Sequence, residues 1–401
     1  MHPTALKARW VFPVSAPPIV DGVVTIAAGA IVAVGREAIG CVPRDLGNVA
    51  IVPGLVNAHT HLEFSDVPRP LGRAKMAFPD WIRQVVEFRR GQSERGESPI
   101  RQGLQESLSA GTTTLGEIAR PGWPVDAVTN SPLAPTVFLE AIGLTPKIHH
   151  PKLAEARAHL EEGASAGHWR AGLCPHAPYT VHPELFASLI ALAVEKRAPI
   201  AFHLAESPQE LELLSGGGGP FRELLVELGA WHSTAIPHGA RPLDYLRLLA
   251  KSERTLVIHG NCLDNEEVDF VAAHSDRMSV VYCPRTHAYF GHARHPLPRL
   301  LAAGANVAVG TDSRASNPDL SILEEMRYIA RHFPEIPPAT VLELGTLRGA
   351  RALGLDDVGC IEPGKTANLA IVALPQREVG DPHELLFDSE LPVAETTIGN
   401  S

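Results

Sequence analysis

Two histidines spaced i and i+2 are the first residues of this chain whose types and spacing suggest chemistry. His59 and His61 end the apolar run "AIVPGLVNAHTH". Residues at i and i+2 of a β-strand point to one face, so both imidazoles would face one point. Two hydrogen-bonded core histidines are the alternative. We favour metal ligands, because catalytic metals often take several imidazoles and keep one position open for water.

Two further polar residues end later apolar runs. His203 closes "PIAFH", and Asp312 follows "NVAVG". If these runs are strands of one barrel, three imidazoles and one carboxylate converge and predict a divalent metal, Zn²⁺ by default, with Fe²⁺ or Mn²⁺ as alternatives. Binuclear sites of this kind use a carboxylated lysine near the end of the fourth strand. The fourth run, "AGLCPHAPYT", contains no lysine, so we expect one ion.

Glu206 and His259 stand beside the predicted ligands. Glu206 follows His203 by three residues, at the start of "ESPQE". It could cap a helix there, but we favour a proton shuttle between activated water and substrate. His259 ends "TLVIH" and is predicted to hydrogen-bond the reacting water, with a further metal ligand as the alternative.

Other residues near the strand ends are candidates for binding substrate. His176, in "CPHAPYTVH", is predicted to face the substrate, and a structural role is an equal alternative. The stretch "VVYCPRTHAYFGH" has the residue types of a zinc site. Because the metal set is complete elsewhere, we expect Cys283 to be buried and Arg285 and His287 to bind substrate from a loop. The role of His292 stays open.

Eight apolar runs alternate with helical segments between residues 54 and 361. Each run is apolar on both faces and ends in polar residues, which is typical of parallel strands covered by helices. The helical segments are 80–90, 98–110, 151–163, 182–197, 221–231, 243–251 and 319–333. Ser98 and Asp264 are predicted helix caps. We predict a (β/α)8 TIM barrel, because polar residues gather at nearly all strand ends, and not at the single switch point of an open doubly wound sheet.

The two ends of the chain do not follow the barrel pattern. Residues 1–53 and 362–401 contain strand-like runs with glycine turns and no helices between them. We expect them to form a small β-sandwich domain in which both termini meet. The glycines 216–219 are predicted to be a flexible loop after the fifth strand. They lack the Lys and Ser/Thr of a phosphate-binding loop.

The bulk composition excludes several classes of partner. The 401 residues carry a net charge of −10 with a pI near 6.0, which argues against nucleic-acid and anionic-membrane surfaces. No apolar run reaches the roughly 18 residues of a membrane span. The broken apolar start predicts no signal peptide. Five scattered cysteines without CxxC are typical of reduced thiols, so we expect a cytoplasmic protein.

Four motifs, in order, resemble the amidohydrolase superfamily: "PGLVNAHTHLE", "HLAES", "VIHG" and "GTDS". The resemblance covers most of the chain, including "GCIEPGKTANLAIVAL" near the end. Within the superfamily, these motifs look like those of the deaminase and chlorohydrolase branch. That branch includes S-adenosylhomocysteine, methylthioadenosine, guanine, triazine and aminofutalosine aminohydrolases. The resemblance implies that the metal ligands are His59, His61, His203 and Asp312. It also implies that Glu206 is the proton shuttle and that His259 polarises water or substrate. It also allows Asp312 to accept a proton from that water.

This branch implies hydrolytic deamination of an amino-substituted N-heterocycle with release of ammonia. Activated water would attack the carbon that bears the amino group, and Glu206 would protonate the adjacent ring nitrogen. "HTHLEFS", "FPDWIRQVVEFRR" and "HAPYTVHP" are similar to segments of aminofutalosine deaminases, which act on an adenine-bearing nucleoside. Related purines, pterins and triazines are alternative substrates. "CPRTHAYFGH" departs from the CPxSN-type segment of the branch, with Thr286 and His287 in place of serine and asparagine.

Two other functions compete with deamination. The first is a hydrolytic dehalogenase or cyclic amide hydrolase on the same scaffold. The second is a non-catalytic scaffold barrel, which we disfavour because all four predicted ligands and Glu206 are present. In each enzymatic case the partner is a small molecule, and the family is compatible with a homodimer.

Overall fold

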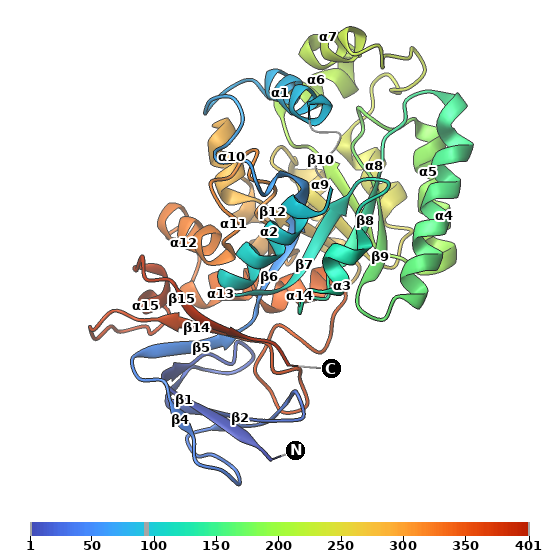
Figure 1. The fold of residues 1–401 in the computed structure, drawn as a ribbon. Helices are drawn as coiled ribbons and strands as arrows, with labels where there is room; N and C mark the ends of the chain where they lie inside the picture. The colour runs from blue at the N-terminus through green and yellow to red at the C-terminus, as the bar shows by residue number, and fades with distance from the viewer. Residues whose placement is uncertain (1, 92–95, 400–401) are drawn as a thin grey trace.

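The computed structural model describes residues 2–91 and 96–399, and its centre is a barrel of eight parallel strands (Figure 1). The barrel strands are β6 (Leu55–Thr60), β7 (Thr112–Ala119), β8 (Thr136–Ala141), β9 (Arg170–Pro175), β10 (Ile200–Leu204), β11 (Thr255–His259), β12 (Met278–Tyr282) and β13 (Asn306–Val309). They are hydrogen-bonded in sequence order, and an isolated parallel bridge from Thr60 to Asp312 joins the last strand region to the first. The predicted barrel is therefore confirmed, and each predicted run contains one strand of the barrel.

The barrel strands are buried along nearly their whole length, which explains their continuous apolar character. Alternate residues such as Val56, Leu256 and Ile258 pack inside the barrel. Helix α14 (Leu347–Leu353) adds Ala350 and Leu353 to this inner cluster, and its contacts run to β6 and β13. Since apolar residues fill the barrel interior, the polar residues that follow the strands remain available at its C-terminal end.

Most helices lie between consecutive barrel strands in the sequence, and the last ones follow the final barrel strand. They are α1 (Phe78–Arg90), α2 (Ser98–Ser109), α3 (Val125–Thr129), α4 (His149–Ser165), α5 (Pro183–Lys196), α6 (Pro208–Gly216), α7 (Gly219–Glu227), α8 (Pro242–Leu249), α9 (Asn265–Ala273), α10 (Pro284–Phe290), α11 (Leu297–Ala302), α12 (Ile322–His332), α13 (Pro338–Leu344) and α15 (Glu384–Phe387), with 3₁₀ turns η1 (Leu62–Phe64) and η2 (Pro146–Ile148). None of the helices in the described ranges is long and apolar enough to cross a membrane.

Two local predictions about these helices need correction, and one is confirmed. Asp264 caps α9 as predicted, because its carboxylate accepts the amide hydrogen of Glu267. Ser98 is the first residue of α2 and not its cap, and the residue at the N-cap position, Glu97, makes no side-chain capping hydrogen bond. The glycines 216–219 lie between the fifth strand and "PFRELLVELGAW", as predicted, but they are not all loop, because Gly216 ends α6 and Gly219 begins α7. They join α6 to α7, and Gly217 takes the left-handed conformation that ends α6.

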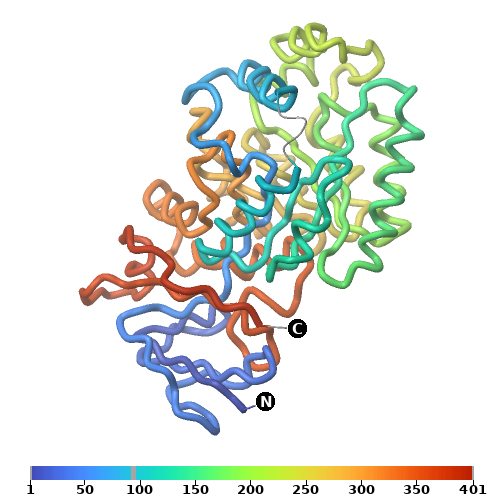
Figure 2. The backbone as a smooth tube through the Cα atoms, viewed as in Figure 1, coloured from blue at the N-terminus to red at the C-terminus, as the bar shows by residue number. Residues whose placement is uncertain are grey.

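The second sheet is built from both ends of the chain, as predicted. Its strands are β1 (Thr4–Val11), β2 (Ile19–Ala27), β3 (Ala30–Gly35), β4 (Arg44–Asp45), β5 (Val49–Pro53), β14 (Leu369–Ala373) and β15 (Val393–Thr397). They form one continuous mixed sheet in the order β15-β14-β5-β1-β2-β3, with β4 beside β1. Figure 2 shows the blue and red ends of the chain side by side below the barrel. Only Gly54 separates β5 from β6, so one extended segment enters the barrel from this sheet.

Candidate metal centre and active site

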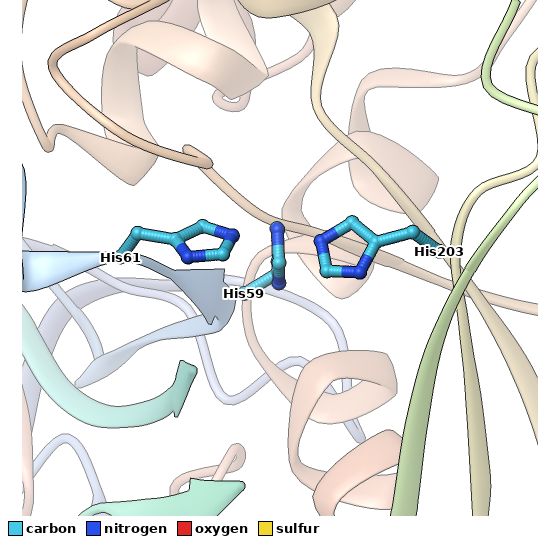
Figure 3. Close-up of side chains that lie close together, drawn as sticks. All are labelled: His59, His61 and His203. Atoms are coloured by element: carbon cyan, nitrogen blue, oxygen red, sulfur yellow. The ribbon is translucent and has the colours of Figure 1, made fainter. Parts of the chain in front are cut away.

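Three histidines meet at the C-terminal end of the barrel. One ring nitrogen from each of His59, His61 and His203 lies within 4.8 Å of the others, and all three residues are buried. Their imidazole rings face one another from β6 and β10 (Figure 3). The three predicted imidazole ligands are thus brought together from segments about 140 residues apart in the sequence.

A β-bulge helps to aim the first pair of histidines. Val56 and Ala58 point into the barrel, so regular alternation would turn His59 outward. The pairing of β6 with β7 shifts register between Asn57 and Thr60, and such irregularities re-aim side chains next to active sites. Beyond the shift, the buried carboxylate of Glu117 accepts the hydroxyl of Thr60 at 2.6 Å. The chain around both histidines is therefore fixed by strand β7.

Asp312 completes this cluster. Its Oδ1 atom lies 3.7 Å from Nε2 of His59 and 3.7 Å from Nε2 of His61. The hydroxyl of Ser316 donates to the other oxygen, Oδ2, at 2.9 Å. The backbone of Asp312 is left-handed, with φ of 58°, and its amide donates to the carbonyl of His59. The structure thus places this carboxylate next to two of the imidazoles with which it was predicted to converge, and adds a left-handed backbone that the sequence did not predict.

The unpaired nitrogens of this cluster fit a cation. Both ring nitrogens of His59 and Nδ1 of His61 are buried without a hydrogen-bond partner in the described part of the chain. Nδ1 of His203 lies 3.0 Å from the carbonyl of His176, so an N–H there donates and leaves Nε2 free as a ligand. Burial, and then the neighbouring imidazoles, holds the pKa of His61 and of His203 well below the ordinary value. Neutral imidazoles are the form that binds metal ions.

Glu206 stands beside the cluster without serving as a helix cap. Its side chain is buried, and Oε1 lies 3.4 Å from Nε2 of His259. The cap of α6 is Ser207, whose hydroxyl accepts the amide hydrogen of Glu210. Burial raises the pKa of Glu206 well above its ordinary value, and the charges of Asp312 and Glu210 raise it further. The surroundings of this carboxyl group therefore favour its protonated form more than water would.

The carboxylate of Glu210 supports the backbone on which Glu206 sits. It accepts the amide hydrogens of Ala205 at 2.9 Å and of Glu206 at 2.8 Å. Ala205 has a left-handed backbone with φ of 54°. Burial raises the pKa of Glu210 to about 7. The sequence reasoning missed this role, because it depends on a turn between strand and helix.

His259 reaches the cluster through an unusual backbone. Leu256 and Ile258 point into the barrel, so regular alternation would turn His259 outward. Its φ is 69°, and the amide of Gly260 donates to the carbonyl of Ile258, which makes a γ-turn centred on His259. With this turn the ring comes 5.6 Å from the ring of His59, measured between centroids.

A cavity of about 420 Å³ opens onto this cluster. Its polar residues are His61, Arg89, Thr145, His176, Thr180, His203, Glu206, His259, Asp312 and Ser313. Its apolar wall includes Phe64, Phe78, Trp81, Ile82, Val85, Val86, Leu144, Leu224, Leu225 and Leu228, mostly from α1 and α7. The cavity therefore combines the polar residues of the cluster with a large apolar surface.

The three residues predicted to bind substrate lie in different places. His176 lines the cavity, with Nδ1 2.8 Å from the hydroxyl of Thr180. Arg285 and His287 are not among the described residues that line it. The loop predicted to carry them is helix α10, and the guanidinium of Arg285 is bound by Asp319 at 2.6 Å and Glu325 at 2.7 Å. These carboxylates, distant in sequence, turn Arg285 away from the cavity.

The other candidate residues of that segment pack among protein side chains and do not line the cavity. Cys283 is buried, as predicted. His287 is also buried, and its ring centroid lies 5.6 Å from that of His292. Burial lowers the pKa of both histidines to about 4. Cys283 and these two histidines do not appear in either metal-type group found among the described residues.

The sequence reasoning missed Arg89 and Glu140. Arg89 is in α1 and lines the cavity. Glu140 is a buried residue of β8. A carboxylate oxygen of Glu140 lies 3.9 Å from Nη1 of Arg89, and the other lies 3.7 Å from Nε2 of His176. Burial opposes the charge of Arg89, but Glu140 and then Glu63 raise its pKa. Nothing in the run of arginines 83, 89 and 90 distinguishes the one that faces the cavity.

A second group with metal-ligand types is formed by His149, His182 and Glu184. It differs from the first because Glu184 is exposed and Nδ1 of His182 already accepts the amide hydrogen of Glu184. Helices α4 and α5 also begin there, and helix N-termini repel cations. This group therefore lacks the electrostatics of a metal centre.

Comparisons with known proteins match nearly the whole chain. Residues 50–397 match the model of the amidohydrolase family. An adenosine deaminase of Helicobacter pylori is 28% identical over 82% of this chain and 80% of its own. An aminodeoxyfutalosine deaminase of Deinococcus radiodurans is 30% identical over 78% and 75%. The crystal structure of an adenosine deaminase from Xanthomonas campestris with bound zinc is similar at a TM-score of 0.80 and 26% identity, covering 99% of this chain and 91% of that one.

Proposed function

Because this chain belongs to the amidohydrolase family, we propose that it is a metal-dependent hydrolytic deaminase of an adenine-bearing nucleoside. The observation that carries the proposal is the pair Glu206 and His259, 3.4 Å apart, beside a buried cluster of metal-ligand type on the wall of one cavity. The names of two relatives, an adenosine deaminase and an aminodeoxyfutalosine deaminase, support this substrate class.

The ion that we propose is a single Zn²⁺, held by His59, His61, His203 and Asp312. The bound zinc of the related adenosine deaminase supports this identity. A divalent cation at such a site acts as a Lewis acid and lowers the pKa of a bound water towards 7. The unpaired ring nitrogens described above are the chain's own reason to expect a cation there.

The side chains around the ion carry out the proton transfers. Glu206 accepts a proton from the attacking water and donates it to the ring nitrogen next to the reacting carbon. The imidazole of His259 hydrogen-bonds the attacking oxygen and so orients it. A carbon–oxygen bond forms, and Asp312 takes the second proton of the attacking oxygen and passes it to the exocyclic amino group. The bond from the carbon to that amino group then breaks, and ammonia leaves. His176 contacts the heterocycle from the same rim of the barrel.

The cavity wall supports a substrate larger than a free base. Adenine needs only part of about 420 Å³, and the rest is lined by apolar side chains of α1 and α7. An apolar substituent on the ribose would bury surface against Phe78, Trp81 and Leu224. Arg285 and His287 keep at most an indirect influence on binding, through the position of α10.

We further propose a cytoplasmic location and a catalytic domain of residues 54–361, with 1–53 and 362–401 forming the second domain. All five cysteines, which lie within the described ranges, are free thiols, which supports a reducing compartment. A homodimer is the assembly that we expect from the family.

Ammonia release tests the proposal. The purified protein, loaded with one equivalent of Zn²⁺, is assayed with adenosine, 5′-methylthioadenosine, S-adenosylhomocysteine and aminodeoxyfutalosine, with guanine, a pterin and an aminotriazine for comparison. We expect ammonia from at least one nucleoside, and none from a His59→Ala variant. Chloride from a chlorotriazine or acid from a cyclic amide, without ammonia from any nucleoside, would refute deamination.

A further inference from the structure

The backbone of His259 is held in a conformation that a histidine rarely adopts. The γ-turn with φ of 69° is strained for a residue with a side chain, and such strain persists only when neighbouring groups fix it. The strain has a use, because without it the ring would leave the inner face of the barrel. Something must therefore hold the carbonyl of His259 in place.

His295 holds that carbonyl. It lies between α10 and α11, is buried, and has Nε2 3.0 Å from the carbonyl oxygen of His259. Its other nitrogen, Nδ1, has no hydrogen-bond partner among the described residues. Only a neutral ring with its proton on Nε2 suits this environment, so Nε2–H donates to the carbonyl.

The ring of His295 is itself fixed by packing. It stacks on the ring of Tyr282, with centroids 3.8 Å apart and an interplanar angle of 22°. Tyr282 ends β12 and is buried, and its ring meets Phe333 edge to face. Burial lowers the pKa of His295 to about 3, which favours the neutral ring as the donor.

We propose that His295 is a positioning residue, whose hydrogen bond to the carbonyl of His259 keeps the His259 imidazole against Glu206. The inference rests on the proposed function, since it assigns His295 to the same reaction. It also explains why a histidine stands at this position, because an apolar side chain would fill the space but leave the carbonyl of a strained turn unpaired.

The test compares His295→Leu with His295→Gln. With the nucleoside that gives most ammonia, we expect His295→Leu to lower kcat about 10- to 100-fold, with KM within about threefold and zinc content unchanged. Gln can donate an amide hydrogen to the same carbonyl, so His295→Gln should recover most of kcat.

The matched control is His332→Leu. His332 also stacks on a tyrosine, Tyr328, at 3.8 Å, and its Nδ1 lies 2.9 Å from a backbone carbonyl, but it is exposed on α12. This variant should keep kcat. Equal losses in His295→Leu and His295→Gln, or a loss confined to thermal stability or zinc content, would overturn the proposal.

A crystal structure of His295→Leu separates this inference from the proposed function. We expect the backbone of His259 to relax and its imidazole to move away from Glu206, whether or not any nucleoside is a substrate. An unchanged γ-turn at His259 would overturn the positioning role even if the protein is an active deaminase.

Discussion

Replacing Glu206 by glutamine removes one proton carrier and little else. Glutamine has nearly the same shape, and the amide and carbonyl of residue 206 keep their hydrogen bonds to Glu210 and Asn261. Glu206 is not one of the four residues proposed to hold the ion, so the variant should bind as much zinc as the parent. The cap of α6 belongs to Ser207, so stability should change little.

The size of the effect depends on whether another carboxylate can take over. Asp312 already accepts the hydroxyl of Ser316 and faces two imidazoles. The carboxylate of Glu210 is occupied by two backbone amides. Both carboxylates are therefore engaged by other groups, and we expect Glu206→Gln to lose the contribution of a general acid–base group at the ring nitrogen. That contribution is about 10²- to 10⁴-fold in kcat, or about 3 to 5 kcal/mol of transition-state stabilisation.

The assay is steady-state ammonia release, with zinc content and thermal unfolding measured on the same samples. We expect kcat to fall within that range for Glu206→Gln, while the zinc content and the midpoint of unfolding match those of the parent. A kcat within tenfold of the parent would refute the role of Glu206 as proton carrier. A loss of zinc would instead make this residue part of the metal centre.

Three other predictions follow from the same geometry. His203→Ala should lower zinc content from about one ion per chain to well below half, because it removes a ligand; an unchanged content by elemental analysis would defeat the metal centre. Burial raises the pKa of Glu210 to about 7, so the folded chain binds this proton more tightly than the unfolded chain does. Its contribution to stability is therefore present at low pH and is lost as pH rises through about 7, by up to about 3 kcal/mol. Urea unfolding of the parent and of Glu210→Gln should then differ in pH dependence between about pH 5 and pH 8, and parallel profiles would contradict this. In Gly116→Ala, the new Cβ would lie 2.7 Å from the carbonyl oxygen of Ala58. We therefore expect the free energy of unfolding to fall by about 1 to 3 kcal/mol. An unchanged free energy of unfolding would show that the barrel backbone shifts to accept the methyl group.

The barrel was predictable because its signal is local. Each strand is buried on both faces and gives a short apolar run, and each run ends in a polar cluster. The cap of α2 and the helical state of Gly216 and Gly219 were not predictable in this way. Ser98 has the right type for a cap, but the chain enters the helix one residue earlier, with Glu97 at the cap position.

The metal-type residues were predictable because each ends a strand of one barrel, which brings them together whatever the loops do. The cavity was not. Arg285 looked available because its partners, Asp319 and Glu325, follow it by more than 30 residues. Arg89 and Glu140 were missed for the opposite reason, since they meet only when α1 folds over β8. Long-range pairing decides which charges face a substrate, and a single sequence does not record it.

The position of β14 has a consequence for synthesis on the ribosome. This strand pairs with β5, from which it is separated by roughly 300 residues of barrel. At about 10 residues per second, the edge of β5 stays unpaired for on the order of half a minute while the barrel emerges. An open edge of this kind invites pairing with other nascent chains. The cell must therefore shield this edge, or the barrel must fold early enough to bury the β5–β6 segment, before the last strand closes the sheet.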